Sequence, residues 1–275
     1  MVRLSVNVNK VATLRNSRGG SVPDVLEAVR VCVAAGAPGI TVHPRGDERH
    51  ITRADVRAIA RELLPLRDQI EFNIEGDPRP DLLELVQEVQ PHQCTLVPVV
   101  PGEITSQAGW STSTSQDEMR RIVADLKSVG VRVSLFVDPE IAAVDWAADM
   151  GGDRVELYTE PFARAFEQGA AAGQESFARY AGAARRAHER GLGVNAGHDL
   201  DLSNLPLFRQ LPHLDEVSIG PIQWCGNTCE RVDLTRSRTN HQLVEGRRLT
   251  ETAARLRELP RPIQQAIPHH GRHST

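Results

Sequence analysis

The fold is decided by the stretch Ile40-Thr-Val-His43-Pro-Arg45-Gly-Asp-Glu-Arg-His50, in which a short apolar run ends abruptly in two histidines and two arginines. This pattern is typical of a buried strand that opens into a loop able to bind an anion. The same design recurs along the chain at residues 4–10, 70–76 and 193–198. Functional groups at successive strand ends predict one active site built from many strand–helix units.

Short apolar or alternating runs predict eight strands, at residues 4–8, 39–42, 69–74, 93–97, 132–137, 154–157, 193–196 and 216–219. Amphipathic stretches between them predict helices at 24–35, 52–64, 81–89, 115–129, 141–150 and 176–190. Thr52 is the expected N-cap of one helix, and Ser115 with Glu118 fits a capping box on another.

Strict alternation of strand and helix predicts a parallel sheet, because each parallel return needs a crossover. Eight units in about 220 residues fit a closed parallel sheet, the (β/α)₈ TIM barrel of the α/β class. A doubly wound open sheet is the alternative. It would usually carry a Gly-rich dinucleotide turn after its first strand, and that turn is missing here.

The composition indicates a globular enzyme: of 275 residues, 40% are apolar and 25% are charged. No stretch approaches the roughly 20 apolar residues of a membrane span, and the N-terminus lacks the layout of a signal peptide. Four cysteines, Cys32, Cys94, Cys225 and Cys229, do not make a disulfide framework. We therefore expect a cytoplasmic protein without membrane partners, and the net charge of −4 argues against nucleic-acid binding.

The chain divides at residue 220. Residues 1–220 form the expected catalytic barrel, whereas residues 221–275 are an atypical C-terminal segment with nine arginines and five acidic residues. This segment therefore carries a net charge of +4, and the remainder carries −8. We expect it to supply the last barrel helix and a disordered tail.

Three basic side chains surround the end of the second strand. His43 suits a general acid/base, and Arg45 suits a phosphate clamp. His50 lies close enough in sequence to reach the same anion. A solvated loop after an ordinary strand is the alternative.

Glu71, Asn73 and Glu75 alternate along the third strand and so point to one side. Burying carboxylates against helices is costly, so this side is predicted to face the barrel interior. A buried glutamate has a raised pKa, and Glu71 is therefore a candidate general base. A structural glutamate is the alternative, and it fits Glu75 better than Glu71.

Further candidates follow the first, fourth and seventh strands. His198 follows Gly197, whose small size lets a ligand approach the backbone, and it could deliver a proton to a leaving group. Asn7, Asn9 and Lys10 end the first strand and are followed by Arg15 and Arg18, which suit phosphates. Thr105 lies in the loop after the fourth strand. The spacing of Cys225 and Cys229 lacks a second ligand pair, so no metal site is expected.

These pieces, taken in order, resemble the pyridoxine 5′-phosphate synthase family, which acts last in one vitamin B6 pathway. The matching segments are 5–18, 39–45, 49–52, 96–98, 103–105, 133–138 and 194–198. The resemblance implies a TIM barrel that assembles as a homo-octamer from dimers and uses no metal or organic cofactor. It also implies condensation of 3-amino-2-oxopropyl phosphate with 1-deoxy-D-xylulose 5-phosphate.

The resemblance implies a role for each matching residue. His43 and Glu71 would be proton acceptors, and His198 would be the proton donor. Together with the candidates from the residues themselves, the predicted substrate-binding set is Asn7, Asn9, Lys10, Arg18, Arg45, His50, Thr105, Gly197, Asp199, Gly220 and Pro221. Within it, Asn7 would contact the amino-ketone phosphate, and Arg45, His50 and Thr105 would contact deoxyxylulose phosphate.

The eighth strand departs from the family pattern. The family has Ile-Gly-His followed by an apolar helix, whereas this chain has Ile219-Gly220-Pro221 and then a polar, Arg-rich stretch. Proline lacks the N–H group as well as the imidazole. Either the tail is a natural divergence, or the coding sequence is frameshifted near codon 221, which the abrupt change in charge favours.

Two other functions remain open from the sequence. A sugar-phosphate aldolase or isomerase would need a Schiff-base lysine or a metal, and Lys10 is the only lysine at a strand end. A catalytically dead barrel, kept as a binding or assembly subunit, is suggested by Pro221 and opposed by His43, Glu71 and His198.

Overall fold

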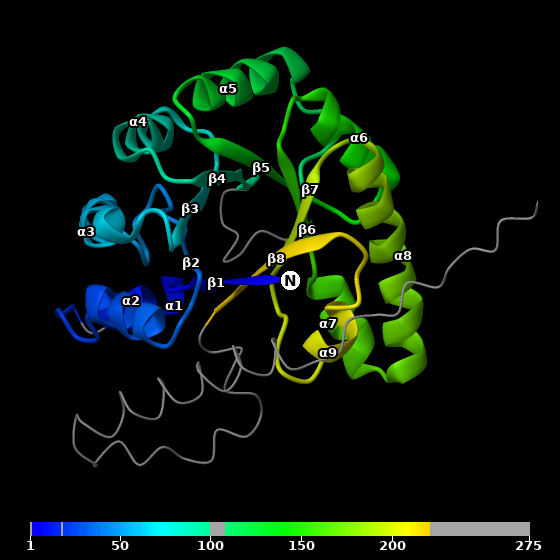
Figure 1. Ribbon diagram of the computed structural model, residues 1–275, viewed down its shortest axis with the longest axis horizontal. Coiled ribbons are helices and arrows are strands. Elements are labelled where there is room, and N and C mark those ends of the chain that lie inside the picture. Colours follow the sequence, from blue (N-terminus) through cyan, green and yellow to red (C-terminus); the bar gives the residue numbers. More distant parts are fainter. Residues whose placement is uncertain (1, 18, 100–107, 221–275) are drawn as a thin grey trace, which may run out of the picture.

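The computed structural model describes residues 2–17, 19–99 and 108–220 (Figure 1). The predictions for Arg18, Thr105, Pro221 and the whole segment 221–275 lie outside the described residues.

Eight strands form a closed barrel in chain order, with β8 paired to β1 and every neighbouring pair parallel. Their bounds are β1 (Arg3–Asn7), β2 (Gly39–Val42), β3 (Glu71–Gly76), β4 (Gln93–Leu96), β5 (Arg132–Val137), β6 (Arg154–Tyr158), β7 (Gly193–Gly197) and β8 (Leu214–Ile219). The predicted TIM barrel is confirmed, and each observed strand overlaps a predicted one, with ends that differ by up to two residues.

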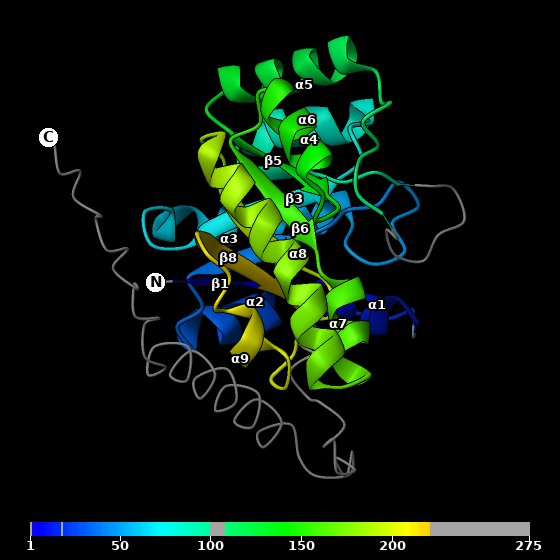
Figure 2. The ribbon, with the colours of Figure 1, turned by 90° about the vertical axis from the view of Figure 1, so that its right-hand side faces the viewer.

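Helices surround the barrel on its outer side (Figures 1 and 2). They are α1 (Asn9–Ser17), α2 (Val25–Ala34), α3 (Arg53–Leu63), α4 (Pro80–Val89), α5 (Gln116–Ser128), α6 (Ile141–Asp149), α7 (Glu160–Glu167), α8 (Ala170–Glu189) and α9 (Leu205–Phe208), with the 3₁₀ turn η1 (Leu64–Leu66). Among these, α1, α7 and α9 were not predicted. In the part of the chain that the structure describes, no helix could cross a lipid bilayer.

The capping predictions have different outcomes. Thr52 caps α3, since its hydroxyl accepts the Asp55 N–H at 3.1 Å while the Asp55 carboxylate accepts the Thr52 N–H at 2.8 Å. Ser115 is the N-cap residue of α5, but its side chain makes no capping hydrogen bond. The capping box predicted for Ser115 and Glu118 is therefore wrong.

The two sides of each strand face different surroundings. Outward residues such as Val6, Ile40 and Ile74 are completely buried in the apolar layer between sheet and helices. Inward residues are buried but polar: Ser5, Thr41, Asn73, Gln93, Thr95, Ser134, Glu156, Asn195, Glu216 and Ser218. Several of these groups hydrogen-bond to one another, as in the 2.6 Å contact between the Ser5 and Thr41 hydroxyls on neighbouring strands. Among the described residues, the Ser134 hydroxyl, the Asn195 amide nitrogen and one Glu216 carboxyl oxygen have no hydrogen-bond partner. The barrel therefore has an apolar outer layer and a polar lumen.

Candidate active site

The carboxyl ends of β1 and β2 are tied together by two asparagines. The Asn7 side-chain oxygen accepts the Asn9 N–H at 3.0 Å, and the Asn9 side-chain oxygen accepts the His43 N–H at 2.8 Å. His43 follows β2 directly and is buried. Asn7 and Asn9 thus hold the backbone of His43, so their positions also have a structural explanation beside the predicted substrate contacts.

The loop after β2 is held by α1. Arg15 donates two hydrogen bonds to the Asp55 carboxylate, at 2.6 and 2.9 Å. Asn16 donates to the His50 carbonyl at 2.9 Å, and Arg15 donates to the same oxygen at 3.3 Å. Arg15 was predicted to suit a phosphate. Its guanidinium is instead bound to Asp55, at the start of α3.

His50 projects its ring back toward His43. Its Nδ1 accepts the Ile51 N–H at 2.9 Å, and the centres of the two imidazole rings lie 6.0 Å apart. Arg45 is buried beside them. Burial, followed by the positive charge of Arg45, lowers the pKa of His50 to about 4. The structure therefore brings together the three groups that the sequence placed after the second strand.

His198 lies just beyond β7 in a constrained backbone. His198 and Asp199 have φ angles of 79° and 56°, in the left-handed region that most side chains avoid. The Thr159 hydroxyl donates to the carbonyls of Gly197 and His198 and so fixes this turn. The His198 ring packs against Phe136, with ring centres 4.9 Å apart. This orientation is over-determined, as is usual for residues that serve a binding or catalytic site.

Burial favours the neutral form of both predicted catalytic histidines. Burial lowers the pKa of His43 well below its usual value, and the neighbouring charges of His50, Arg45 and His198 lower it further. Burial also lowers the pKa of His198. His43 follows the last residue of β2 and His198 follows the last residue of β7, so both lie at the carboxyl end of the barrel. A neutral imidazole can both accept and donate a proton.

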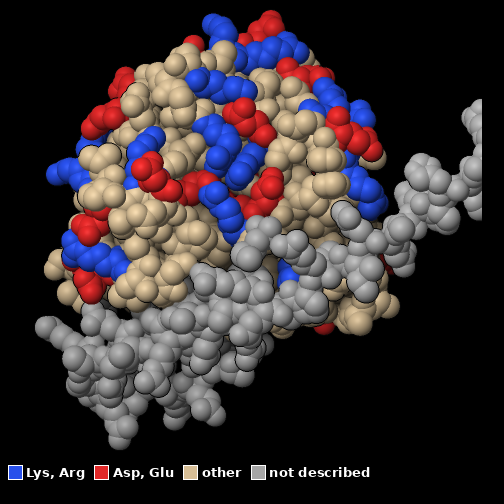
Figure 3. Space-filling model, viewed as in Figure 1, with Lys and Arg blue, Asp and Glu red and all other residues tan. Residues whose placement is uncertain are grey.

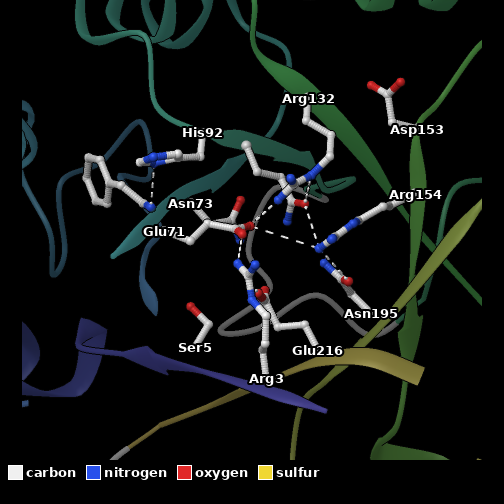
Figure 4. Close-up of polar contacts among 12 residues, drawn as sticks. Arg3, Ser5, Glu71, Asn73, His92, Arg132, Asp153, Arg154, Asn195 and Glu216 are labelled. Carbon is white, nitrogen blue, oxygen red and sulfur yellow. Dashed lines mark hydrogen bonds and ion pairs between the residues drawn. The ribbon is translucent and has the colours of Figure 1, made fainter. Parts of the chain in front are cut away.

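Glu71 lies at the other end of the barrel, in a cluster of arginines (Figure 4). It is the first residue of β3 and is 7% exposed. Its carboxylate forms ion pairs with Arg3 and Arg132, and Arg154 Nη1 lies 3.9 Å away. At about 3.3 Å of rise per residue, Glu71 is roughly 13 Å along the strand from Glu75. The structure therefore does not bring Glu71 to His43, and its proton-acceptor role stays a prediction.

Glu75 is the carboxyl group that the structure places beside His43. Its Oε2 lies 4.0 Å from His43 Nδ1, and the residue is 4% exposed. Burial raises its pKa well above the usual value, and the charges of Glu156 and Glu216 raise it further. Strand alternation had correctly predicted that Glu71 and Glu75 face the interior.

The described residues contain no group of three or more His, Cys, Asp or Glu side chains that could hold a metal ion. Cys32 and Cys94 are buried and free, whereas Cys225 and Cys229 lie outside the described residues.

Comparison with known proteins shows which family the chain belongs to. Residues 4–225 match the family model described as "Pyridoxal phosphate biosynthesis protein PdxJ". The chain belongs to the PdxJ family. A relative from Porphyromonas gingivalis is 50% identical over 221 residues, which cover 80% of this chain and 90% of the relative. One from Christiangramia forsetii is 52% identical with the same coverage. Both are named pyridoxine 5′-phosphate synthase.

Solved structures outside the PdxJ family share the architecture. The "Native KDPGal structure" aligns with a TM-score of 0.54 at 12% identity, covering 93% of this chain and 96% of that one. Phosphoribosyl anthranilate isomerase from Thermus thermophilus aligns with a TM-score of 0.52 at 15% identity, covering 93% and 100%. At these identities the likeness shows the fold alone.

Sequence reasoning missed Arg79, which lies after β3 and holds the loops beside the candidate site. Arg79, after the end of β3, donates to the Pro44 carbonyl at 2.6 Å and pairs with Asp77 at 2.5 Å. It therefore links the loops after β2 and β3. Its signal in the sequence was the same as that of Arg45, a basic residue shortly after a predicted strand.

Proposed function

We propose that this chain is a pyridoxine 5′-phosphate synthase, which condenses 3-amino-2-oxopropyl phosphate with 1-deoxy-D-xylulose 5-phosphate and releases phosphate and water. Membership in the PdxJ family supports the assignment of these two substrates. The observation that carries the chemistry is the pair of histidines at the carboxyl end of the barrel, buried His43 and half-buried His198, whose pKa values are lowered by burial. The imine forms between the two substrates, so the protein has to position them and transfer protons.

The proposed roles follow the resemblance and the geometry. His43 accepts protons and His198 donates one, while Arg45 and His50 bind a phosphorylated substrate at the end of β2. The proposed binding set also includes Asn7, Asn9, Lys10, Gly197, Asp199 and Gly220, together with Arg18, Thr105 and Pro221, which lie outside the described residues. Glu71 keeps its proposed role as an acceptor only if a Glu71→Gln variant loses turnover while still binding substrate.

No metal or organic cofactor enters this proposal. We further propose that the protein acts in the cytoplasm as a homo-octamer built from dimers, which light scattering of the purified full chain would test.

The positions of the two lysines argue against a Schiff-base aldolase. The chain has two, Lys10 and Lys127. Lys10 is exposed in α1, and Lys127 lies near the end of α5, where it pairs with Asp153 at 2.7 Å. A catalytic lysine needs a desolvated pocket that lowers its pKa, and neither position offers one.

The deciding experiment is a direct assay of the full chain with both phosphorylated substrates, following pyridoxine 5′-phosphate by absorbance and mass. Product from the wild type, lost in His43→Asn and His198→Asn variants that still melt normally, is the expected result. No product from a folded wild-type chain would refute the synthase and favour the dead barrel. Restoring a Gly-His eighth strand with an apolar helix would then test whether Pro221 and the tail are responsible.

A further inference from the structure

We propose that Glu75 is the proton store of His43: its carboxyl group exchanges a proton with His43 Nδ1 while His43 Nε2 exchanges one with the substrate. This inference rests on the proposed function and deepens it, because it adds a residue that acts through His43. Glu75 would therefore be a positioning and relay residue, and it would not touch the substrate itself.

The geometry aligns the two side chains. Val42 pairs with Ile74 in the β2–β3 ladder, so His43 and Glu75 follow on neighbouring strands at the same height. The Asn9 contact fixes the His43 backbone, and 4.0 Å separates Glu75 Oε2 from His43 Nδ1. A small side-chain rotation would close this gap to a hydrogen bond, since catalytic hydrogen bonds often tighten when substrate binds.

The opposite edge of the His43 ring is available for chemistry. His43 Nε2 is buried and makes no hydrogen bond among the described residues. A buried polar atom without a partner is costly, and at the carboxyl end of a barrel strand such an atom is placed to bind substrate. Nδ1 therefore faces Glu75 while Nε2 remains to face the substrate.

The surroundings of Glu75 favour its protonated form. Burial raises its pKa most, the charges of Glu156 of β6 and Glu216 of β8 raise it further, and the hydrogen bond from the Ser218 hydroxyl of β8 lowers it in part. Cys94 of β4 lies close enough for Glu75 to help raise the pKa of its thiol to about 12. Burial and the neighbouring carboxyl groups favour the neutral acid, and the raised pKa of Glu75 agrees with this.

The relay balances one proton. When the Nε2–H bond breaks and its proton bonds to a substrate oxygen, the Glu75 proton moves to Nδ1. The imidazole stays neutral, and the negative charge rests on the Glu75 carboxylate. When Nε2 next removes a proton from the substrate, Nδ1 returns its proton to Glu75. The pair can therefore take a proton from the substrate and return to its starting state, while His198 donates the proton of the leaving group as proposed above.

The test is Glu75→Gln in the full chain, because glutamine keeps the size and can donate an N–H to Nδ1 but cannot release a proton. We expect kcat to fall by roughly 100-fold with KM little changed, since general acid–base steps contribute that much and the loss falls on the transition state. The alkaline limb of the wild-type kcat profile, where Glu75 loses its proton, should disappear. Glu75→Asp should restore part of kcat together with a titrating limb.

A second readout separates this inference from the proposed function. The ¹⁵N resonance of His43 Nδ1 should shift as Glu75 titrates in the wild type and should not shift in Glu75→Gln. That measurement needs no turnover. A wild-type chain that makes no product refutes the synthase, while the NMR titration still tests the pair. A Glu75→Gln variant that retains wild-type kcat and its alkaline limb, or a His43 resonance indifferent to Glu75, would overturn the relay.

Discussion

Replacing Glu71 by glutamine should destabilise the barrel, whatever it does to turnover. Arg3 of β1 and Arg132 of β5 form ion pairs with its carboxylate, and Arg154 of β6 lies 3.9 Å from it. The variant therefore leaves three guanidinium groups around a neutral amide. In the view of Figure 3, acidic and basic side chains gather together over the centre of the barrel.

The magnitude follows from the exposure of the partners. Removing one member of a fully buried ion pair costs about 3–5 kcal/mol. Here the side chains of Arg3 and Arg132 are 44% and 30% exposed, so both can turn toward water. Glu216 also lies 3.6 Å from Arg3 and takes over part of its charge. We therefore expect a loss of about 2–3 kcal/mol, at the lower end of the range or below it.

The assay is thermal unfolding at a fixed scan rate. For a chain of this size the expected loss lowers the melting temperature by roughly 5–10 °C. Glu140→Gln is the matched control, because Glu140 pairs with Arg179 on the surface and both side chains are more than half exposed. That variant should melt like the wild type. If the Glu71 and Glu140 variants melt alike, the arginine cluster does not stabilise the barrel as argued.

Three further predictions concern the loops. The His50 imidazole should titrate by NMR near pH 4, so the unfolded chain takes up this proton first and the free energy of unfolding should fall from pH 6.5 to 4; an unshifted His50 would contradict this. Asp55→Ala removes the Arg15 partner and should raise KM for deoxyxylulose phosphate more than it lowers kcat. In Gly109→Ala the new Cβ would lie 2.3 Å from the Asp138 backbone nitrogen, so we expect the backbone before Trp110 to shift and the tryptophan emission to change. An unchanged emission would contradict this expectation.

The sequence predicted the strands well because their lengths and alternation are local properties. The helices that it missed have weak local patterns. In α1, only Ala12 is buried, and the helix consists largely of polar residues that read as a basic loop. It is stabilised by distant groups instead, such as Asp55, which lies 40 residues from its partner Arg15. A pattern within a short window cannot show such a contact.

The sequence predicted which face of the sheet the candidate site residues lie on, but it did not predict their position along the barrel axis. Alternation placed Glu71 and Glu75 correctly in the lumen, but it could not show which end of the barrel each one reaches. That depends on where β3 begins, and the strand begins at Glu71 in the structure although its predicted start was residue 69. Two residues of strand decide whether a carboxyl group meets arginines or a histidine.

The polar lumen has a consequence for how the chain selects one pairing of its strands. A slip of β3 by one residue would turn Glu71, Asn73 and Glu75 into the hydrocarbon layer and bring Phe72 and Ile74 into the lumen. Polar residues inside the barrel therefore select the register, because only one alignment buries the apolar side chains in the outer layer and also gives the carboxyl groups polar neighbours. Redesigning the lumen with aliphatic side chains would remove that penalty, and slipped barrels would then compete with the native one during folding.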